Sequence, residues 1–423
     1  MRITSIINLF AGIMLFLFVP TSSAQDTEQV PDSLKKDAVN MFLDCHRCDM
    51  NHIRREIPYI NYVRDVREAD VYVLQTRQST GSGGTEYTYT FHGQGRFSGL
   101  NDTLVYNSRP DDTMDFTRNG TTKMLAMGLL RYVAKTPQFH EVDIESKGEA
   151  RAEEVVDNWD YWVFELDFDP EFEFEESRSS LNWENSFNSS RITPAMKFEL
   201  DAEMRLRRTK YNYDDTTFVR DRNSWSLENI TVFSLSDHWS AGFRTDLRSS
   251  TYSNIELSWD FFPSLEYNLF PYAESTRRQL RFLYGVGYAY YDYFETTIYE
   301  QDKESLFEQS LDIAYRIQQK WGSINVSLEA SNYLHDFSKN RFELDGWVSI
   351  RIIKGLSFSI RGSAARINNQ LGLPKGDLDE AEILLELQEL RTTYSIDGGI
   401  GLTYTFGSIY NNVVNPRFGN GRW

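Results

Sequence analysis

Two cysteines are the first side chains in the chain whose chemistry is easily recognised. Cys45 and Cys48 frame the segment Cys-His-Arg-Cys and are the only two cysteines among the 423 residues. A pair at this spacing closes as a disulfide in an oxidising compartment, whereas a thiolate at a helix N-terminus could serve in redox exchange. Two reduced thiols with no chemical role are a third alternative. A zinc site would need two further ligands, for which His46 and His52 are available.

Three residues near position 336 carry the side chains of a serine hydrolase. His335, Asp336 and Ser338 occur within four consecutive positions. Catalytic triads are normally assembled from distant segments, so neighbours in a loop rarely reach the required geometry. We therefore expect polar loop residues and no enzyme here, with a lipid hydrolase as the alternative. The sequence contains no recognised cofactor motif, and none is expected.

Acidic residues form a regular row between positions 165 and 175. Every second residue is acidic, and the residues between them are mostly aromatic or aliphatic. Alternate side chains of a strand point to opposite faces, so this pattern predicts a strand with one charged and one apolar face. If the charged face lines a water-filled interior, it raises the local concentration of cations. The expected lumen row is Glu165, Asp167, Asp169, Glu171, Glu173 and Glu175.

Long alternating segments must position this row. The segment 196–207 alternates in the same way over twelve residues, which is longer than the five or six residues usual in soluble sandwich strands. Lipid outside and water inside would explain such strands. We count twelve segments, an even number as in bacterial barrels. They begin near Tyr161, Arg178, Pro194, Arg222, Trp239, Asn254, Arg278, Lys303, Gly322, Asn340, Gly355 and Arg391.

The connections between these segments alternate between mostly short turns and longer loops. The longest expected loops are 208–221, 294–302 and 366–390, and all three fall at the same end of the strands. Long loops are typical of the extracellular end of a barrel, and short turns of the periplasmic end. This predicts Tyr213 and Lys375 outside the cell, and Trp239 and Trp423 in the periplasm. The stretch 377–390 is amphipathic and is expected to form a helix that serves as a stabilising cap, with a lid over the barrel mouth or a partner-binding helix as alternatives.

The region ahead of the strands mixes helical and strand periodicity. Strands are predicted over 39–44, 69–76, 85–92 and 102–106, and helices over 49–57 and 121–134. A stretch of about 100 residues is a normal domain size. We therefore expect a small α/β domain, joined by a charged linker to the first long strand.

The first 24 residues have the pattern of a signal peptide. Arg2 precedes an apolar run over 6–19, Pro20 ends this run, and small residues lead to Ala24. This pattern predicts export, with cleavage before Gln25. The net charge of −18 argues against nucleic acid as a partner.

The last predicted strand contains an assembly-signal pattern formed by Gly401, Tyr404 and Phe406. It resembles the β-signal that the barrel-assembly machinery recognises, which implies this machinery as a partner. It departs from the pattern at Gly399, where a polar residue is usual, and in continuing to Trp423.

The mature chain also resembles an uncharacterised family of Gram-negative outer-membrane β-barrel proteins with an N-terminal periplasmic α/β module. The resemblance is carried by Phe42-Leu-Asp-Cys45 with Cys48-Asp49, and by the segments 67–74, 334–342 and 404–418. It implies a barrel and its location, and it carries no assigned activity.

The sequence thus predicts an all-β transmembrane antiparallel barrel of about twelve strands, preceded by a small α/β periplasmic domain. Its expected location is the outer membrane, in contact with lipid, with the N-terminal domain in the periplasm. The expected function is a narrow channel or transport-related pore with an acidic lumen. The alternative is a non-conducting structural or assembly barrel whose periplasmic domain binds a protein or peptidoglycan. The expected divisions are a signal peptide (1–24), periplasmic domain (25–140), linker (141–160), barrel (161–407) and periplasmic tail (408–423).

Overall fold

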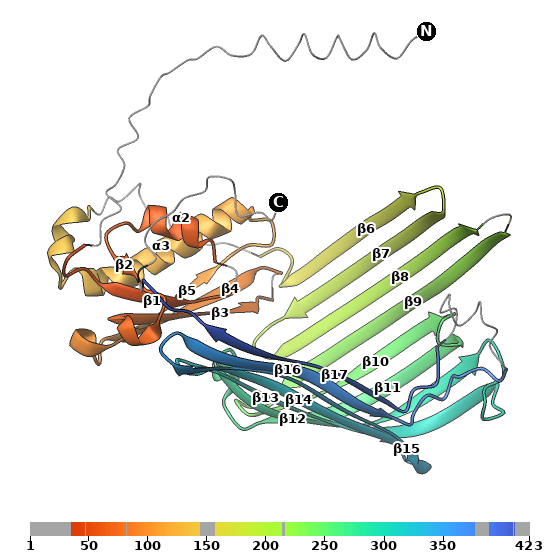
Figure 1. Cartoon of the computed structure of the whole chain (residues 1–423). Helices are drawn as coiled ribbons and strands as arrows, with labels where there is room; N and C mark the ends of the chain where they lie inside the picture. The colour runs from red at the N-terminus through yellow and green to blue at the C-terminus, as the bar shows by residue number, and fades with distance from the viewer. Residues whose placement is uncertain are drawn as a thin grey trace, which may run out of the picture.

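The computed structural model describes residues 35–46, 48–81, 83–143, 157–213, 216–376, 389–408 and 410. The predicted signal peptide, most of the predicted helix over 377–390, and Trp423 lie outside these residues. The described part contains a small mixed sheet with helices and a large antiparallel sheet (Figure 1). None of the described helices is long and apolar enough to cross a membrane.

The N-terminal domain has a five-stranded sheet in the order β2-β1-β3-β4-β5. β1 is parallel to β2 and β3, and the remaining neighbours are antiparallel. The predicted α/β character is confirmed, although the two-residue β2 was not predicted because it is too short to show periodicity. The elements are β1 (Asn40–Asp44), α2 (Met50–Glu56), β2 (Asn61–Tyr62), η1 (Val66–Glu68), β3 (Val71–Ser79), β4 (Thr85–Gly93), η2 (Gly95–Phe97), β5 (Asn101–Asn107), α3 (Met114–Val133) and η3 (Pro137–Glu141).

Helix α3 begins seven residues before the predicted start at 121. The Thr113 side chain caps it by accepting a hydrogen bond from the Phe116 amide at 3.2 Å, and such a cap satisfies one of the free amides of the first turn. The helix packs on the sheet where Gly128 faces the Phe91 ring, so closely that a Cβ at position 128 would lie 2.1 Å from it. Fully buried side chains from both layers form the core: Met41, Val71, Val73, Tyr89, Phe91, Leu125, Leu129 and Tyr132.

The large sheet has twelve strands, each antiparallel to its neighbours in sequence order, so the predicted strand number is confirmed. A single 3₁₀ turn, η4 (Tyr272–Glu274), lies between β11 and β12. The strands are β6 (Trp162–Phe174), β7 (Arg178–Ile192), β8 (Met196–Tyr213), β9 (Thr216–Ser234), β10 (Trp239–Ser250), β11 (Ile255–Asn268), β12 (Arg278–Tyr293), β13 (Lys303–Gln319), β14 (Gly322–Tyr333), β15 (Asp336–Ile353), β16 (Leu356–Ile367) and β17 (Tyr394–Tyr404).

The loop predicted over 208–221 is wrong for most of its length. β8 and β9 continue as one long hairpin through this segment. Arg208 and Asp221 are directly paired across the hairpin and form an ion pair at 2.8 Å, and Tyr211 pairs with Phe218 in the register. Opposite charges and paired aromatics on facing strands stabilise a ladder, which explains why the hairpin extends.

The large sheet is curved but not closed. Figure 1 shows a trough, with β6 along one rim and β17 along the other. These two edge strands are not hydrogen-bonded to each other in the described part of the chain, so the expected closed barrel is not observed. Neighbouring strands are joined by turns that enforce their pairing, whereas pairing of β6 with β17 would bring together segments more than 200 residues apart with no turn between them.

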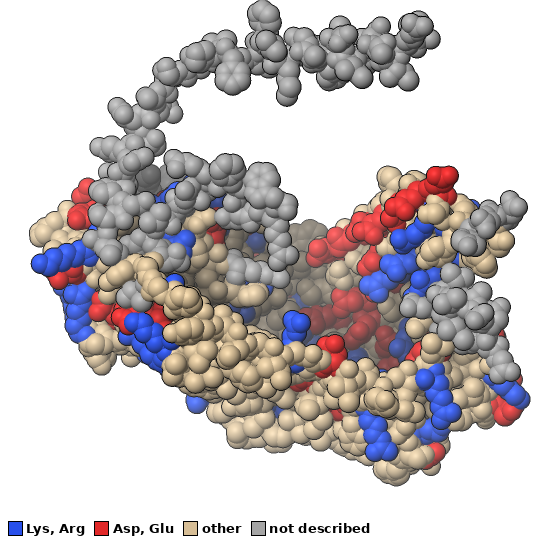
Figure 2. Space-filling model, viewed as in Figure 1, with Lys and Arg blue, Asp and Glu red and all other residues tan. Residues whose placement is uncertain are grey.

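The two faces of the sheet differ in chemistry. The convex side carries exposed apolar side chains, such as Phe168 (70% exposed) and Ile400 (78% exposed) on the edge strands. Asp167 and Asp169, the neighbours of Phe168 on β6, project to the opposite side. Figure 2 shows acidic and basic residues gathered in the hollow, while the outer surface below it is largely uncharged. The expected separation of an apolar outer face from a charged inner face is therefore present.

The N-terminal domain contacts the short-turn end of the large sheet. Arg351 of β15 donates to the Asp44 carboxylate at 2.9 Å, and the Tyr72 hydroxyl donates to the same oxygen at 2.9 Å. Asp65 accepts a hydrogen bond from the Gly355 amide at 2.7 Å, and Glu68 forms an ion pair with Lys354. Acidic side chains of the domain thus match basic side chains of the β15–β16 turn.

Aromatic rings extend this contact. Phe42, Tyr72 and His92 stack in succession on one face of the small sheet, at centroid distances of 6.1 and 5.9 Å. Lys320, in the turn after β13, lies over the Tyr72 ring at 5.6 Å. Burial lowers the pKa of His92, and the charge of Lys320 lowers it further. A neutral His92 avoids repulsion with this lysine, which favours the docked arrangement.

Exchanging the charges of Asp44 and Arg351 tests this docking. We expect Arg351→Asp to lower the equilibrium constant for docking of the domain roughly tenfold or more, because two carboxylates then meet in a half-buried contact. Adding Asp44→Arg in the same chain should restore part of the docking. The measurement is the yield of a disulfide between Glu68→Cys and Lys354→Cys. Equal yields in the single and the double exchange would contradict the contact.

Candidate functional site

The predicted acidic row lies on the concave face of the large sheet, at the β6 rim (Figure 2). Polar side chains of β7 contact it from the same face. Ser186 donates to Asp167 at 3.2 Å and Asn182 donates to Glu171 at 3.3 Å. These side chains therefore share one face with the polar lining of the trough.

Arginines offset part of this row at its loop end. Arg178 forms an ion pair with Glu173 at 3.3 Å. Glu171 and Glu173 also line a cavity of about 600 Å³ together with Arg178, Arg207 and Arg220. Asp167 and Asp169 have no ion pair within the described residues and do not line this arginine-containing cavity, so their negative charge is not compensated in this way.

A second acidic row runs across the strands. Glu165 is paired in register with Asn188, Asn188 with Asp201, and Asp201 with Glu228. Glu228 is then paired with Asp246, and Asp246 with Asp260. Like charges directly opposite each other destabilise a sheet, so stability alone does not explain this row. Its members are distant in sequence. The alternation of side chains within each strand does not indicate the register between strands that aligns them.

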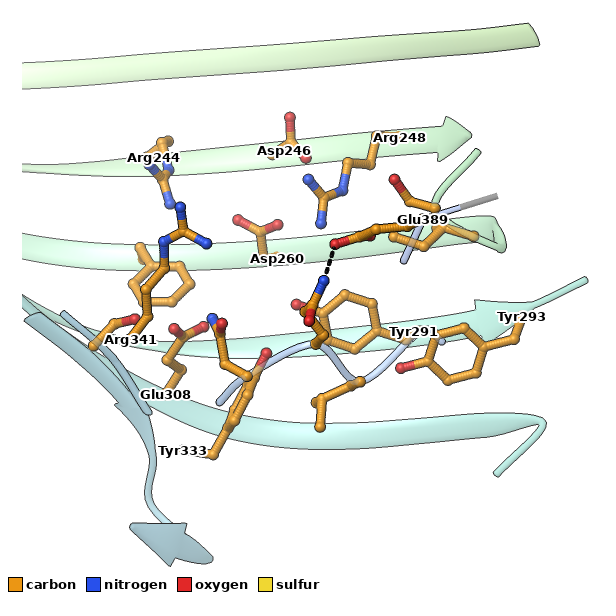
Figure 3. A pocket seen from close by; sticks show the side chains of 18 of the residues that line it. Arg244, Asp246, Arg248, Asp260, Tyr291, Tyr293, Glu308, Tyr333, Arg341 and Glu389 are labelled. Atoms are coloured by element: carbon orange, nitrogen blue, oxygen red, sulfur yellow. Dashed lines mark hydrogen bonds between the residues drawn. The ribbon is translucent and has the colours of Figure 1, made fainter. Parts of the chain in front are cut away.

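The cross-strand row leads into a cavity of about 520 Å³ on the concave face. Strands β9 to β15 supply its wall, and Figure 3 shows the charged side chains pointing into it. Its volume lies within the range of small-molecule sites. The charged lining residues are Glu228, Arg244, Asp246, Arg248, Asp260, Glu308, Glu329, Arg341 and Glu389, and the aromatic ones are Phe262, Tyr291, Tyr293 and Tyr333.

The loop after β16 covers one side of this cavity. Leu371, which is 7% exposed, packs against Leu306 and Tyr333. The Asn254 amide nitrogen donates to the Gly372 carbonyl at 2.9 Å, and the Gln370 amide donates to Glu389 at 2.6 Å. The covering loop is therefore held by both apolar packing and hydrogen bonds. The sequence had indicated only that this connection is long.

Cys45 and Cys48 form a disulfide between β1 and α2, as predicted. The following residue, Asp49, caps α2 by accepting a hydrogen bond from the His52 amide at 2.9 Å. This bond, together with Arg118, holds the pKa of Asp49 below its usual value. Because both sulfurs are bonded to each other, they offer no thiolate to the zinc site considered as an alternative. No group of metal-ligating side chains occurs among the described residues.

The trio at 335–338 does not have the geometry of a catalytic triad. Asp336 accepts hydrogen bonds from both the hydroxyl (2.6 Å) and the amide (2.9 Å) of Ser338. The His335 ring instead lies beside Tyr333, at a centroid distance of 6.0 Å. Within the described residues no hydrogen bond joins His335 to Ser338, so the serine lacks a base here.

The residues of the predicted assembly signal lie on and just after the edge strand β17. Gly401 is paired with Ser359 of β16. Tyr404 and Phe406 stack on each other at 5.6 Å and are 61% and 77% exposed. The two aromatic rings therefore form an accessible apolar patch at an unpaired strand edge.

No protein-family model matches this chain, and no curated protein matches it. The resemblance to outer-membrane barrels consequently gains no support from these comparisons.

Proposed function

We propose that this chain is an outer-membrane β-barrel protein that forms a narrow, acidic, water-filled pore or transport channel. The observation that carries the proposal is the separation of faces over twelve long antiparallel strands, apolar on the convex side and charged on the concave side. A barrel in lipid needs an apolar exterior and a polar interior at once.

In this proposal β6 and β17 pair to close the barrel. In an antiparallel sheet with an even number of strands the two edge strands run in opposite directions, as closure requires. The inward positions of β17 include Gly399 and Gly401, which leave room for the acidic side chains of β6. Eight strands fill with side chains and sixteen leave an open channel, so twelve strands suit a narrow pore.

Membrane fractionation and conductance test the proposal together. We expect the processed chain to fractionate with the outer membrane, and the purified protein to produce discrete current steps in a planar bilayer. Recovery in the soluble periplasmic fraction would overturn the membrane assignment. Current from a preparation whose strands have been heat-unfolded would show that the steps come from a contaminant.

A specific observation favours a second candidate, the non-conducting structural barrel. The N-terminal domain covers part of the short-turn end, and the 368–376 loop covers part of the opposite end. The domain also exposes Met114 (90%), Phe116 (61%) and Met127 (52%) on α3, which could contact a periplasmic protein. Outer-membrane location without any current would favour this candidate.

A further inference from the structure

Among the described residues, no ion pair joins two of the charged side chains that line the cavity beneath the 368–376 loop. Arg244 and Arg248 flank Asp246 on β10, and Asp260 is paired with Asp246 from β11. Neither arginine has a carboxylate within 4.0 Å among the described residues. The Arg248 guanidinium donates to the Ser258 hydroxyl at 3.2 Å, and that of Arg244 lies over the Phe262 ring at 5.4 Å.

Elsewhere on the same face, arginines and carboxylates do form contacts. Arg205 binds Glu184 at 3.1 Å, and Arg281 forms an ion pair with Asp312. In this cavity, by contrast, Arg244 and Arg248 lie near carboxylates without an ion pair among the described residues. A structural network would gain stability by pairing them, whereas a binding site keeps such groups available for a ligand.

One carboxylate oxygen in the cavity directly supports a binding site. Oδ1 of Asp260 is buried and has no hydrogen-bond partner in the described part of the chain. A buried acceptor without a hydrogen-bond donor destabilises the fold, and a donor from a ligand would offset this cost. Figure 3 shows Asp260 facing the cavity between Arg244 and Arg248.

The spacing of the charges indicates the class of ligand. Positions two apart on a strand are separated by about 7 Å, so the Cα atom of each arginine lies about that far along β10 from the Cα atom of Asp246. The two termini of an extended dipeptide are also about 7 Å apart. We infer that the cavity binds a short zwitterionic peptide, such as a dipeptide, whose ammonium group contacts Asp246 and Asp260 and whose carboxylate contacts Arg244 or Arg248.

The remaining lining fits such a ligand. Phe262, Tyr291 and Leu371 add apolar surface between the charged groups, and Leu371 belongs to the covering loop. The ligand would thus contact both the sheet and the loop. This inference rests on the proposed function in one respect, namely that the inner side of the sheet is open to water. No residue of the edge strands β6 and β17 lines the cavity.

Calorimetric titration of the purified full chain in detergent tests the site with diglycine as the probe. We expect N-acetyl-diglycine and diglycine amide, which each lack one terminal charge, to bind at least roughly tenfold more weakly. Equal binding of all three, or no binding of diglycine, would overturn the inference. Because no membrane is involved, a conducting pore that fails to bind diglycine would refute the site and leave the proposed function standing.

Substitutions test which residues contact the ammonium group and the carboxylate of the ligand. Asp260→Asn and Arg244→Gln should each weaken diglycine binding at least roughly tenfold. Arg361 lies on β16, on the same concave side of the sheet but outside the cavity, so Arg361→Gln should leave diglycine binding unchanged. Asp260→Asn should also reduce the advantage of diglycine over its N-acetyl form. Equal losses in the Arg361 variant would overturn the inference. If a variant fails to fold, the ligand series on the unaltered chain still decides.

Discussion

A chain with Asp167→Asn and Asp169→Asn is expected to form a pore with clearly weaker preference for cations. These two carboxylates belong to the row that alternation directs to the concave face, and no arginine in the described residues pairs with them. In a confined interior, uncompensated carboxylates raise the local cation concentration. Removing two of the six should lower the row's contribution by about a third.

Reversal potentials in a planar bilayer under a salt gradient measure this preference. The matched control is Glu171→Gln with Glu173→Gln, which removes the same charge from the end where Arg178 and Arg207 lie close. Its effect should be smaller, because these carboxylates are already partly neutralised. A larger effect in the control pair, or an anion-selective unaltered pore, would show that the row does not set the selectivity.

Leu129→Ala is expected to destabilise the N-terminal domain by about 2–5 kcal/mol, which is the usual cost of removing a large aliphatic side chain from a packed core. Leu129 is fully buried between α3 and the sheet. A small domain has only about 5–15 kcal/mol of stability in total, so a large part of it would be lost.

Hydrogen exchange of the β3 amides at Val71–Leu74 reports this loss in the full chain. At about 1.4 kcal/mol per tenfold change, exchange should accelerate by roughly thirtyfold to several thousandfold. Met127→Ala, two positions earlier on α3 and 52% exposed, should change it much less. Similar acceleration in both variants would mean that α3 does not pack on the sheet as described.

Local patterns in the sequence identified most of the elements. The twelve alternating segments correspond to β6–β17 because a strand's side-chain period is two residues and is visible in any stretch of five or more. The same alternation separates the charged face from the apolar face. Cys45 and Cys48 are close enough in sequence to be joined within one turn, so their disulfide was also predictable. The boundaries were less accurate where cross-strand pairs, such as Arg208 with Asp221, prolonged a hairpin.

Only the tertiary structure decided the features that depend on distant segments. The alignment of Asp201, Glu228, Asp246 and Asp260 requires the register of four strands, and a shift of one residue would move any of them to the opposite face. Leu371 of the covering loop packs against Leu306, which is far from it in the chain. Asp44 and Arg351, which are in contact, are also far apart in sequence. Strand periodicity is set by the backbone of each segment alone, whereas register, cavities and domain contacts depend on which segments meet, and no local pattern encodes that choice.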